Sequence, residues 1–197
     1  LTEVQSKTQV IVMLPTRIGA FSPDNGELIW SCGGLRHERG DLAYSSPVIA
    51  GNLCFVTGGY RGPSMAVRLG GRGDVTRTGR LWRAENNPQN IGSGVHVSGM
   101  VYRPNAEKRN SLQCIEIATG KIRWSAPGEG HWGSVVMAGK LLYATDQQGN
   151  TVVFRPNPDE YEVVANNPLG EPSNSTPAVS EGQLYIRTAA HLFCIGH

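Results

Sequence analysis

The stretch Ala20-Phe21-Ser22-Pro23-Asp24-Asn25-Gly26-Glu27-Leu28-Ile29-Trp30 decides the fold of this chain, because its pattern recurs. The clearest second copy is Cys114-Ile115-Glu116-Ile117-Ala118-Thr119-Gly120-Lys121-Ile122-Arg123-Trp124. In each copy, small and polar residues ending in a glycine separate two short apolar strands, and tryptophan ends the second strand. Pro at the first central position of a turn and Gly where φ is positive suit such a connection. A repeat of roughly 40 residues made only of strands is typical of β-propeller blades.

Strand signals recur in sets of four, and each set is one predicted blade of an all-β propeller with four-stranded antiparallel blades. The five predicted blades are residues 1–31, 43–85, 91–126, 132–166 and 174–197. The last blade has signals for only three strands, so it lacks its outer strand. An unpaired edge exposes backbone donors and acceptors. We therefore expect the chain to be the C-terminal part of a seven- or eight-bladed ring; the alternative is a five-bladed ring that closes imperfectly.

The composition agrees with an all-β domain. The chain has 197 residues, of which 25 are glycine and 12 are proline, and only 17% are charged. Many short strands joined by tight turns require glycine and proline, whereas helices do not tolerate them.

The distribution of charged and apolar residues argues against nucleic-acid binding and against a membrane span. The 18 basic and 16 acidic residues are interspersed, with a net charge of +2, so no basic stripe indicates nucleic-acid binding. The stretch 68–80 is rich in arginine, but glycines dilute it, and we interpret it as a polar loop between two strands. No apolar run approaches the ~18 residues that span a membrane, and no signal peptide is visible within the chain.

The four cysteines form no Cys-x-x-Cys pair, so no metal site is expected. Cys54, Cys114 and Cys194 occupy strand positions where another blade carries an apolar or small residue. We expect all three to be buried small hydrophobic residues; a disulfide or a reactive thiol is the alternative.

Three tryptophans recur at one position of the blade. Trp30, Trp82 and Trp124 end predicted outer strands, whereas Val164 takes this position in the fourth blade. We predict that the rings pack between adjacent sheets, with Gly26 and Gly120 making the preceding turns; the alternative is an aromatic ligand platform.

The repeats resemble the pyrroloquinoline-quinone (PQQ) type propeller repeat, whose consensus ends in Ala-x-Asp-x-x-Thr-Gly-x-x-x-Trp. Residues 20–30 and 117–124 match it well, and further runs are similar to bacterial PQQ-like propellers that have no assigned activity and to the propellers of outer-membrane assembly lipoproteins. These runs are residues 44–48, 66–71, 91–94, 132–134 and 169–172. The resemblance implies a periplasmic or secreted protein.

The resemblance also raises the question of a cofactor. Quinoprotein alcohol dehydrogenases of this kind carry two adjacent disulfide-bonded cysteines, a calcium site and a catalytic aspartate. No two cysteines are adjacent here, and no acidic cluster has the spacing of a calcium loop. No cofactor is expected, and PQQ stays open by family resemblance only.

Candidate binding residues come directly before or within the predicted innermost strands, where propeller loops converge. They are Tyr44, Ser45, Ser46, Ser93, His96, His131, Trp132, Ser134, Asn174, Ser175 and Thr176. Their hydroxyl groups either satisfy the backbone or form a small-ligand or peptide site. The two histidines are the best titratable candidates, but no catalytic residue and no metal ligand is assigned.

The repeated residues serve packing and turns, which favours a non-catalytic propeller that acts as a protein-interaction scaffold. Its expected partners are a protein and either further blades of the same polypeptide or a second copy. The alternative is a quinone- or sugar-binding protein, or a quinoprotein-type oxidoreductase, whose site is completed by additional N-terminal blades.

Overall fold

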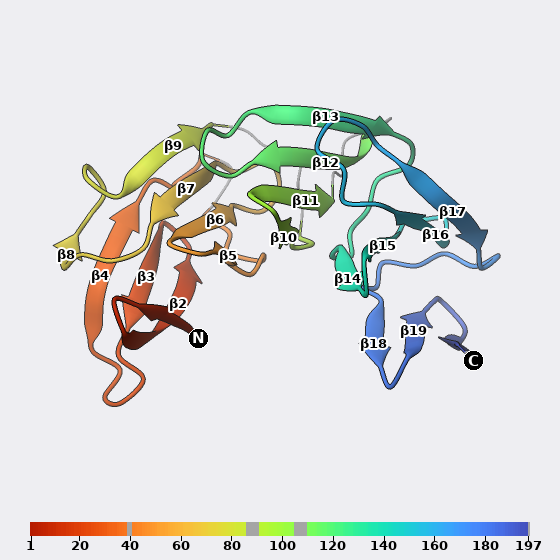
Figure 1. Cartoon of the computed structure of the whole chain (residues 1–197), viewed down its shortest axis with the longest axis horizontal. Helices are drawn as coiled ribbons and strands as arrows, with labels where there is room; N and C mark the ends of the chain where they lie inside the picture. Colours follow the sequence, from red (N-terminus) through yellow and green to blue (C-terminus); the bar gives the residue numbers. More distant parts are fainter. Residues whose placement is uncertain (39–40, 86–90, 105–109, 197) are drawn as a thin grey trace. The chain divides into compact units, whose positions relative to one another are not determined.

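The computed structural model describes residues 1–38, 41–85, 91–104 and 110–196. These residues form twenty β-strands in five sheets, and β-strands are the only regular secondary structure among them (Figure 1). Within the described part, no helix has the length and apolar character needed to cross a membrane. The chain divides into two compact units, Leu1–Pro88 with Glu116–Lys121, and Gln89–Ile115 with Ile122–His197.

The first unit contains two of the sheets. The first sheet has the order β1 (Thr2–Val4), β2 (Lys7–Leu14), β3 (Arg17–Phe21), β4 (Leu28–Gly33) and β8 (Gly73–Asp74). The second has the order β5 (Val48–Ala50), β6 (Leu53–Thr57), β7 (Ser64–Arg68) and β9 (Arg80–Ala84). Sequential neighbours in both sheets pair antiparallel.

Strand β8 lies in the long connection that the sequence analysis interpreted as a polar loop. It pairs parallel to β4, with Trp30 opposite Gly73, and so adds a fifth strand to the first sheet. The N–H of Val75 donates to the carbonyl of Ser31 at 2.8 Å, and the N–H of Gly33 donates to Thr76 Oγ1 at 2.8 Å. The connection therefore covers an edge whose backbone groups would otherwise be unpaired.

The second unit contains the three remaining sheets. The third sheet is β10 (Val95–Val97), β11 (Met100–Pro104), β12 (Asn110–Glu116) and β13 (Ile122–Pro127). The fourth sheet is β14 (Val136–Ala138), β15 (Leu141–Thr145), β16 (Asn150–Phe154) and β17 (Val163–Pro168). The fifth sheet is β18 (Ala178–Ser180), β19 (Gln183–Arg187) and β20 (Leu192–Ile195). Within the described residues the fifth sheet thus has the three strands that were predicted for the last blade.

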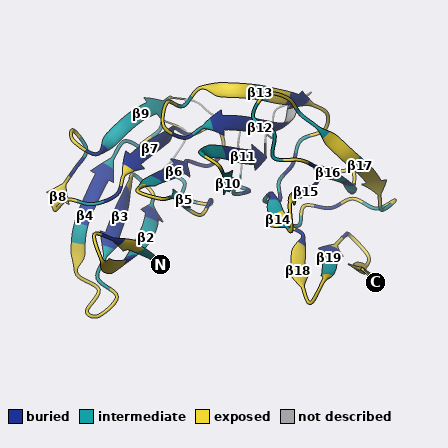
Figure 2. Cartoon of the chain, in the orientation of Figure 1, coloured by how far each residue is buried: buried dark blue, intermediate teal, exposed yellow. Residues whose placement is uncertain are grey.

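Each unit has its own apolar core, which Figure 2 shows as the dark strands of the sheets. In the first unit, Trp30, Ile18 and Met65 are completely buried, and they join residues of both sheets in one cluster. In the second, Tyr102, Leu142 and Phe154 play the same part for the third and fourth sheets. Burial of large apolar side chains between sheets is the main favourable term in such folds.

The repeated turn has the same hydrogen bonds in both of its clearest copies. In the first copy the N–H of Gly26 donates to the carbonyl of Ser22, and in the second the N–H of Gly120 donates to the carbonyl of Glu116, both at 2.9 Å. The two glycines have φ values of 73° and 75°, which side chains disfavour. Moreover, a Cβ on Gly120 would lie 2.7 Å from the Trp82 ring.

The three repeated tryptophans all use their indole N–H. Trp30 donates to Gln9 Oε1 at 3.0 Å inside the first core. Within the first unit Trp82 donates to the carbonyl of Ile117 at 2.8 Å, and within the second Trp124 donates to the carbonyl of Asn157 at 2.9 Å. Two of the three rings thus tie an outer strand to the backbone of a neighbouring turn.

The cysteines are free thiols, and three of them are buried. Burial raises the pKa of the Cys54 thiol, and it raises that of Cys114 to about 11. The prediction that Cys194 is buried is wrong, because this residue is exposed. It lies on β20, and the described part of the fifth sheet has no fourth strand to cover it.

Candidate functional site

The starts of the innermost strands carry most of the predicted site residues, and in the second unit they form a chain of hydrogen bonds between sheets. The N–H of Ser93 donates to Ser134 Oγ at 2.8 Å. The N–H of Ser134 in turn donates to Thr176 Oγ1 at 2.8 Å. The three residues occupy the same place before β10, β14 and β18. Two of these hydroxyl groups therefore accept from the backbone of the preceding sheet, as a structural role requires.

Glycines next to these hydroxyl residues let the sheets approach closely. A Cβ on Gly92 would lie 2.3 Å from the carbonyl oxygen of Gly133. A Cβ on Gly133 would lie 2.1 Å from the carbonyl oxygen of Ser175. Real Cβ atoms do not approach backbone so closely. The backbones are thus in direct contact along this seam between the third, fourth and fifth sheets.

A second group of serines bonds within its own sheet. Ser45 Oγ donates to the carbonyl of Thr57 at 2.7 Å, at the end of β6. In the fifth sheet, Ser173 Oγ and Ser175 Oγ donate to the carbonyl of Arg187, at 2.7 and 2.8 Å. Each hydroxyl has one proton. With that proton committed to a carbonyl, Ser173 and Ser175 can offer a ligand only acceptor lone pairs.

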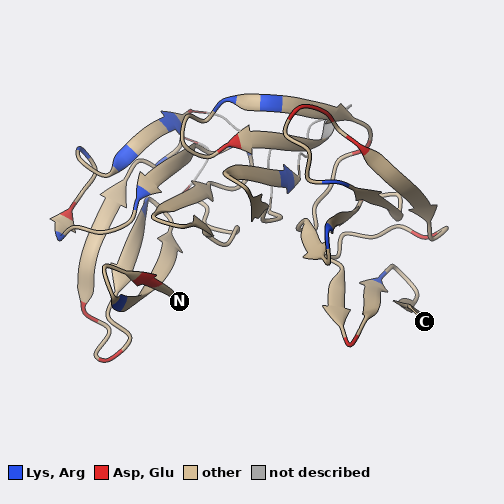
Figure 3. Ribbon diagram, viewed as in Figure 1, with Lys and Arg blue, Asp and Glu red and all other residues tan. Residues whose placement is uncertain are grey.

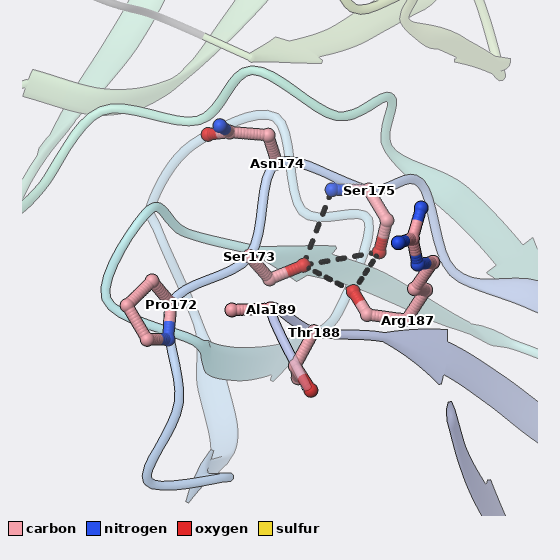
Figure 4. A pocket seen from close by; sticks show the side chains of 7 residues that line it. All are labelled: Pro172, Ser173, Asn174, Ser175, Arg187, Thr188 and Ala189. Carbon is pink, nitrogen blue, oxygen red and sulfur yellow. Dashed lines mark hydrogen bonds between the residues drawn. The ribbon is translucent and has the colours of Figure 1, made fainter. Parts of the chain in front are cut away.

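A pocket of about 390 Å³ opens beside these serines, and Figure 4 shows its lining. It contains two of the predicted residues, Asn174 and Ser175. The full lining is Pro172, Ser173, Asn174, Ser175, Arg187, Thr188 and Ala189. The turn before β18 and the end of β19 thus build one concave surface.

A hydrogen-bond network around Glu171 contacts this pocket through Thr188. The carboxylate of Glu171 accepts from the hydroxyl of Thr188 and the N–H of Ala190, and it contacts the imidazole of His191. The Thr188 and His191 contacts hold the pKa of Glu171 below its usual value. The ionised carboxylate of Glu171 therefore holds Thr188 in place beside the pocket.

A second pocket, of about 210 Å³, lies in the fourth sheet around His131. Glu129, Asp146, Asn150 and Tyr161 are among its lining residues. The side chain of His131 is buried, with 3% exposure, and its Nδ1 has no hydrogen-bond partner. Burial holds the pKa of His131 below the usual value, so the ring is neutral at pH 7.

The other predicted histidine has a local role. His96 lies on β10, and its Nε2 accepts the N–H of Gly99 at 2.9 Å in the turn to β11. Partial burial lowers the pKa of His96. Of the two histidines only His131 lines one of the two pockets above, and Trp132 lines neither of them.

Tyr44 lies in the first unit, where it contacts an aromatic residue that the sequence analysis missed. Its ring meets that of Tyr60 edge to face, with centroids 5.7 Å apart. Both side chains are exposed, at 51% and 39%. Tyr60 and Arg61 form a tight turn between β6 and β7, closed by the N–H of Gly62 donating to the carbonyl of Gly59. The Gly-Gly-Tyr-Arg-Gly-Pro sequence signals the turn, but not the contact with Tyr44.

The charged and ligating side chains of the described residues do not form a metal site. Figure 3 shows basic and acidic residues distributed along the chain. In the described residues, no group of three or more His, Cys, Asp or Glu side chains could hold a metal ion. Pyrroloquinoline quinone carries three carboxylates, whereas the first pocket has one arginine and the second is acidic. These two pockets do not fit that cofactor.

Comparison with protein families places the chain beside a known propeller family. The family model described as outer membrane protein assembly factor BamB, a PQQ-repeat model, matches residues 2–126. No curated protein sequence matches the chain.

Solved structures share the fold at low sequence identity. BamB from Moraxella catarrhalis is 12% identical with a TM-score of 0.54, and the alignment covers 93% of this chain and 68% of that one. The computationally designed Ika8 protein is 12% identical with a TM-score of 0.63, covering 91% and 54%. The quinohemoprotein alcohol dehydrogenase ADHIIG from Pseudomonas putida HK5 is 14% identical with a TM-score of 0.64, covering 94% and 42%. The chain thus spans about half the length of the last two, and the fold is a β-propeller.

Proposed function

This chain belongs to the family of outer membrane protein assembly factor BamB, and we propose that it acts as a non-catalytic scaffold that binds a partner protein. The observation that carries the proposal is the exposed pair of Tyr44 and Tyr60, with Tyr60 on its tight turn. Tyrosine and arginine are enriched among the residues that dominate the energy of protein interfaces. The pair and the neighbouring Arg61 supply both.

The backbone of this turn supports a role beyond folding. Tyr60 and Arg61 have φ values of 48° and 67°, so two consecutive residues with side chains adopt the left-handed conformation. A hairpin turn of this kind prefers Asn-Gly. A residue such as Tyr60 or Arg61 in this left-handed conformation costs of order 1 kcal/mol of stability. A turn that retains Tyr-Arg at this cost is a candidate for selection by binding.

The family supports a location for this function. We infer that the protein acts in the periplasm, at the outer membrane that the family's name describes. Fractionation of cells that express the complete gene would test this. Recovery of the protein with a cytoplasmic marker would contradict the inference.

The test of the scaffold is a double variant, Tyr60→Asn with Arg61→Gly. Its turn is relaxed, so we expect it to be more stable than the wild type by about 1–2 kcal/mol and to lose its partner. Co-purification from an envelope extract measures the loss, and chemical denaturation measures the gain. A matched control is Glu181→Asn, which relaxes another positive φ, of 50°, in the turn between β18 and β19 and leaves the aromatic pair intact. Unchanged co-purification with the double variant would refute this binding surface.

A second candidate function is the binding of a small neutral molecule, such as a sugar, in the pocket around His131. The observation that favours it is the buried, unpartnered Nδ1 of that ring. Amide and carboxylate groups beside apolar Val152 and Val163 also suit a sugar. A thermal shift with mono- and disaccharides that His131→Ala abolishes would support this function; the absence of any shift would exclude it.

A further inference from the structure

We propose that the pocket around His131 receives the side chain of a lysine from the partner protein, with the ammonium group at its buried end. The proposal rests on the proposed scaffold function, because the lysine belongs to the bound partner. It adds a contact in the second unit and the chemistry that this contact recognises. A neutral sugar competes for the same pocket as the second candidate function, and one experiment separates the two ligands.

The pocket is built by the third and fourth sheets. Its lining begins with Pro127 at the end of β13 and ends with Asn166 on β17. Between them it includes Asp146 and Asn150, at the turn from β15 to β16. No described residue of the fifth sheet lines it, so that sheet does not determine its walls. Both contributing sheets belong to the second unit.

The imidazole of His131 presents an unused acceptor to this pocket. Burial lowers the pKa of His131, and the hydrogen bond from the ring to the backbone of Thr145, at the end of β15, opposes that shift, as donation to a carbonyl does. In the fifth sheet Ser173 Oγ donates in the same way to the carbonyl of Arg187. Because Nδ1 has no partner, Nε2 is the nitrogen that donates, and Nδ1 carries a lone pair. With the side chain only 3% exposed, this lone pair requires a donor.

The charge of the pocket decides what kind of donor fits. The described residues of its lining include the carboxylates of Glu129 and Asp146, and no lysine or arginine. Asp146 is buried, and its carboxylate accepts the N–H groups of Gln148 and Asn150 at 2.9 and 2.8 Å. Glu129 is exposed, and the ion pairs of the described chain do not include it. A positively charged ligand is therefore favoured over an anion.

The walls and the size of the pocket suit a single side chain. Val152 on β16 and Val163 on β17 offer apolar surface along which the stem of a lysine packs. The ring of Tyr161 also lines the pocket, and aromatic faces attract cations. The volume of about 210 Å³ lies below the range of about 300–1,000 Å³ that is usual for whole small-molecule ligands. A lysine side chain therefore fits better than a disaccharide.

The positions of the acceptors favour an ammonium group over a guanidinium group. The acceptors come from separate segments: Glu129 and His131 from the connection between β13 and β14, and Asp146 from the turn after β15. The planar fork of an arginine matches the two oxygens of one carboxylate. An ammonium group is compact and directs three donors to separate acceptors. Lysine is therefore the better match.

The experiment uses the whole chain and a fluorescein-labelled pentapeptide amide with one lysine between two pairs of glycines. Two comparison peptides carry Nε-acetyl-lysine or arginine in place of the lysine. Fluorescence anisotropy should show that the lysine peptide binds about tenfold more tightly than the acetylated peptide, and more tightly than the arginine peptide. A neutral disaccharide should not displace it.

Two variants assign the binding to this pocket. Glu129→Gln should weaken the lysine peptide about threefold, as expected of an exposed charge pair. His131→Phe should reduce its binding to the level of the acetylated peptide. Glu160→Gln is the matched control, because Glu160 is an exposed carboxylate next to Tyr161 that does not line the pocket; it should change nothing. Circular dichroism and a melting curve check that His131→Phe is folded, and Glu129→Gln tests the pocket at an exposed residue.

Four results would overturn the proposal. They are equal binding of the lysine and acetyl-lysine peptides, tighter binding of the arginine peptide, no binding at millimolar concentration, and binding that Glu129→Gln leaves unchanged. Displacement of the lysine peptide by the disaccharide would instead favour the second candidate function over this one. These failures are separate from failure of the scaffold, because the Tyr60/Arg61 variant tests the latter through co-purification and leaves the residues of the His131 pocket in place.

Discussion

The fourth and fifth sheets use one repeat position in opposite ways. At the start of the fourth sheet this position is Gly133, and the backbone of Ser175 lies directly against it. At the start of the fifth sheet the position is Ser175 itself, whose side chain fits beside the pocket. Glycine is required where the backbone of the next sheet lies against this position, whereas no further described sheet lies against Ser175, and a side chain is accommodated there. The position is therefore tightly packed only where another sheet of the described chain covers it.

The largest expected effect on stability comes from adding one methyl group where the fourth and fifth sheets are in contact. Gly133→Ala places a Cβ 2.1 Å from a backbone carbonyl oxygen, so the sheets must move apart. We expect a loss of about 3 kcal/mol or more in the free energy of unfolding, measured by chemical denaturation. Gly139→Ala is the control, because its Cβ meets open space and only its positive φ of 60° costs stability, about 1 kcal/mol. Similar losses for both variants would show that the seam is not tight.

The next largest effect on stability should come from the hydrogen bonds that link Ser93, Ser134 and Thr176 across the same seam. Ser134→Ala leaves the N–H of Ser93 without its acceptor. Both residues are half-buried, so we expect a loss of about 1 kcal/mol, at the lower end for unsatisfied groups. Ser134→Thr keeps the oxygen and should restore most of this stability. If alanine is tolerated as well as threonine, the hydroxyl chain has no structural role, and a ligand role for it regains support.

The buried His131 should make stability depend on pH. Its pKa in the folded state is lowered, so the unfolded chain takes up the proton first as the pH falls. The contribution of His131 to the free energy of unfolding should therefore decrease below about pH 6.5, by at most about 1.4 kcal/mol per pH unit, until the pH reaches the lowered pKa of the folded state. His131→Gln should flatten the part of the slope due to this residue, while the smaller part due to His96 persists. Denaturation curves at pH 7.5 and 5.5 measure the slope, and an identical slope in the variant would contradict the assignment.

The smallest effect concerns the repeated tryptophan. Trp124→Phe retains an aromatic ring beside Tyr161 but removes the N–H that donates to the carbonyl of Asn157. We expect a loss of about 1 kcal/mol. Trp30→Phe is the comparison, since its N–H pairs with the buried side chain of Gln9. If Trp124→Phe costs nothing, the ring alone explains why this position of the repeat is tryptophan.

Local patterns predicted the repeating parts of the molecule. The turns at Gly26 and Gly120 depend on a few adjacent residues, and strand alternation depends on the nearest neighbours along the chain. These are properties that a sequence displays directly. The three-stranded last sheet followed from the same count of strand signals.

Features that depend on distant residues were missed. Strand β8 pairs with β4, which belongs to the preceding blade, about 40 residues earlier in the sequence. The contact between Tyr44 and Tyr60 joins two connections across the second sheet. Cys194 has the pattern of a buried residue, yet burial requires a covering strand that the described fifth sheet does not have.

The candidate site residues also differ in whether local sequence or distant contacts determine their role. The sequence placed Ser93, Ser134 and Thr176 together with Asn174 and Ser175 as one group of polar residues at equivalent positions. The all-β repeat follows from the sequence alone, because strand period and turn chemistry are local. Only the tertiary structure decided which of these groups hold sheets together and which border a pocket, because that depends on whether the backbone of another sheet occupies the adjacent space.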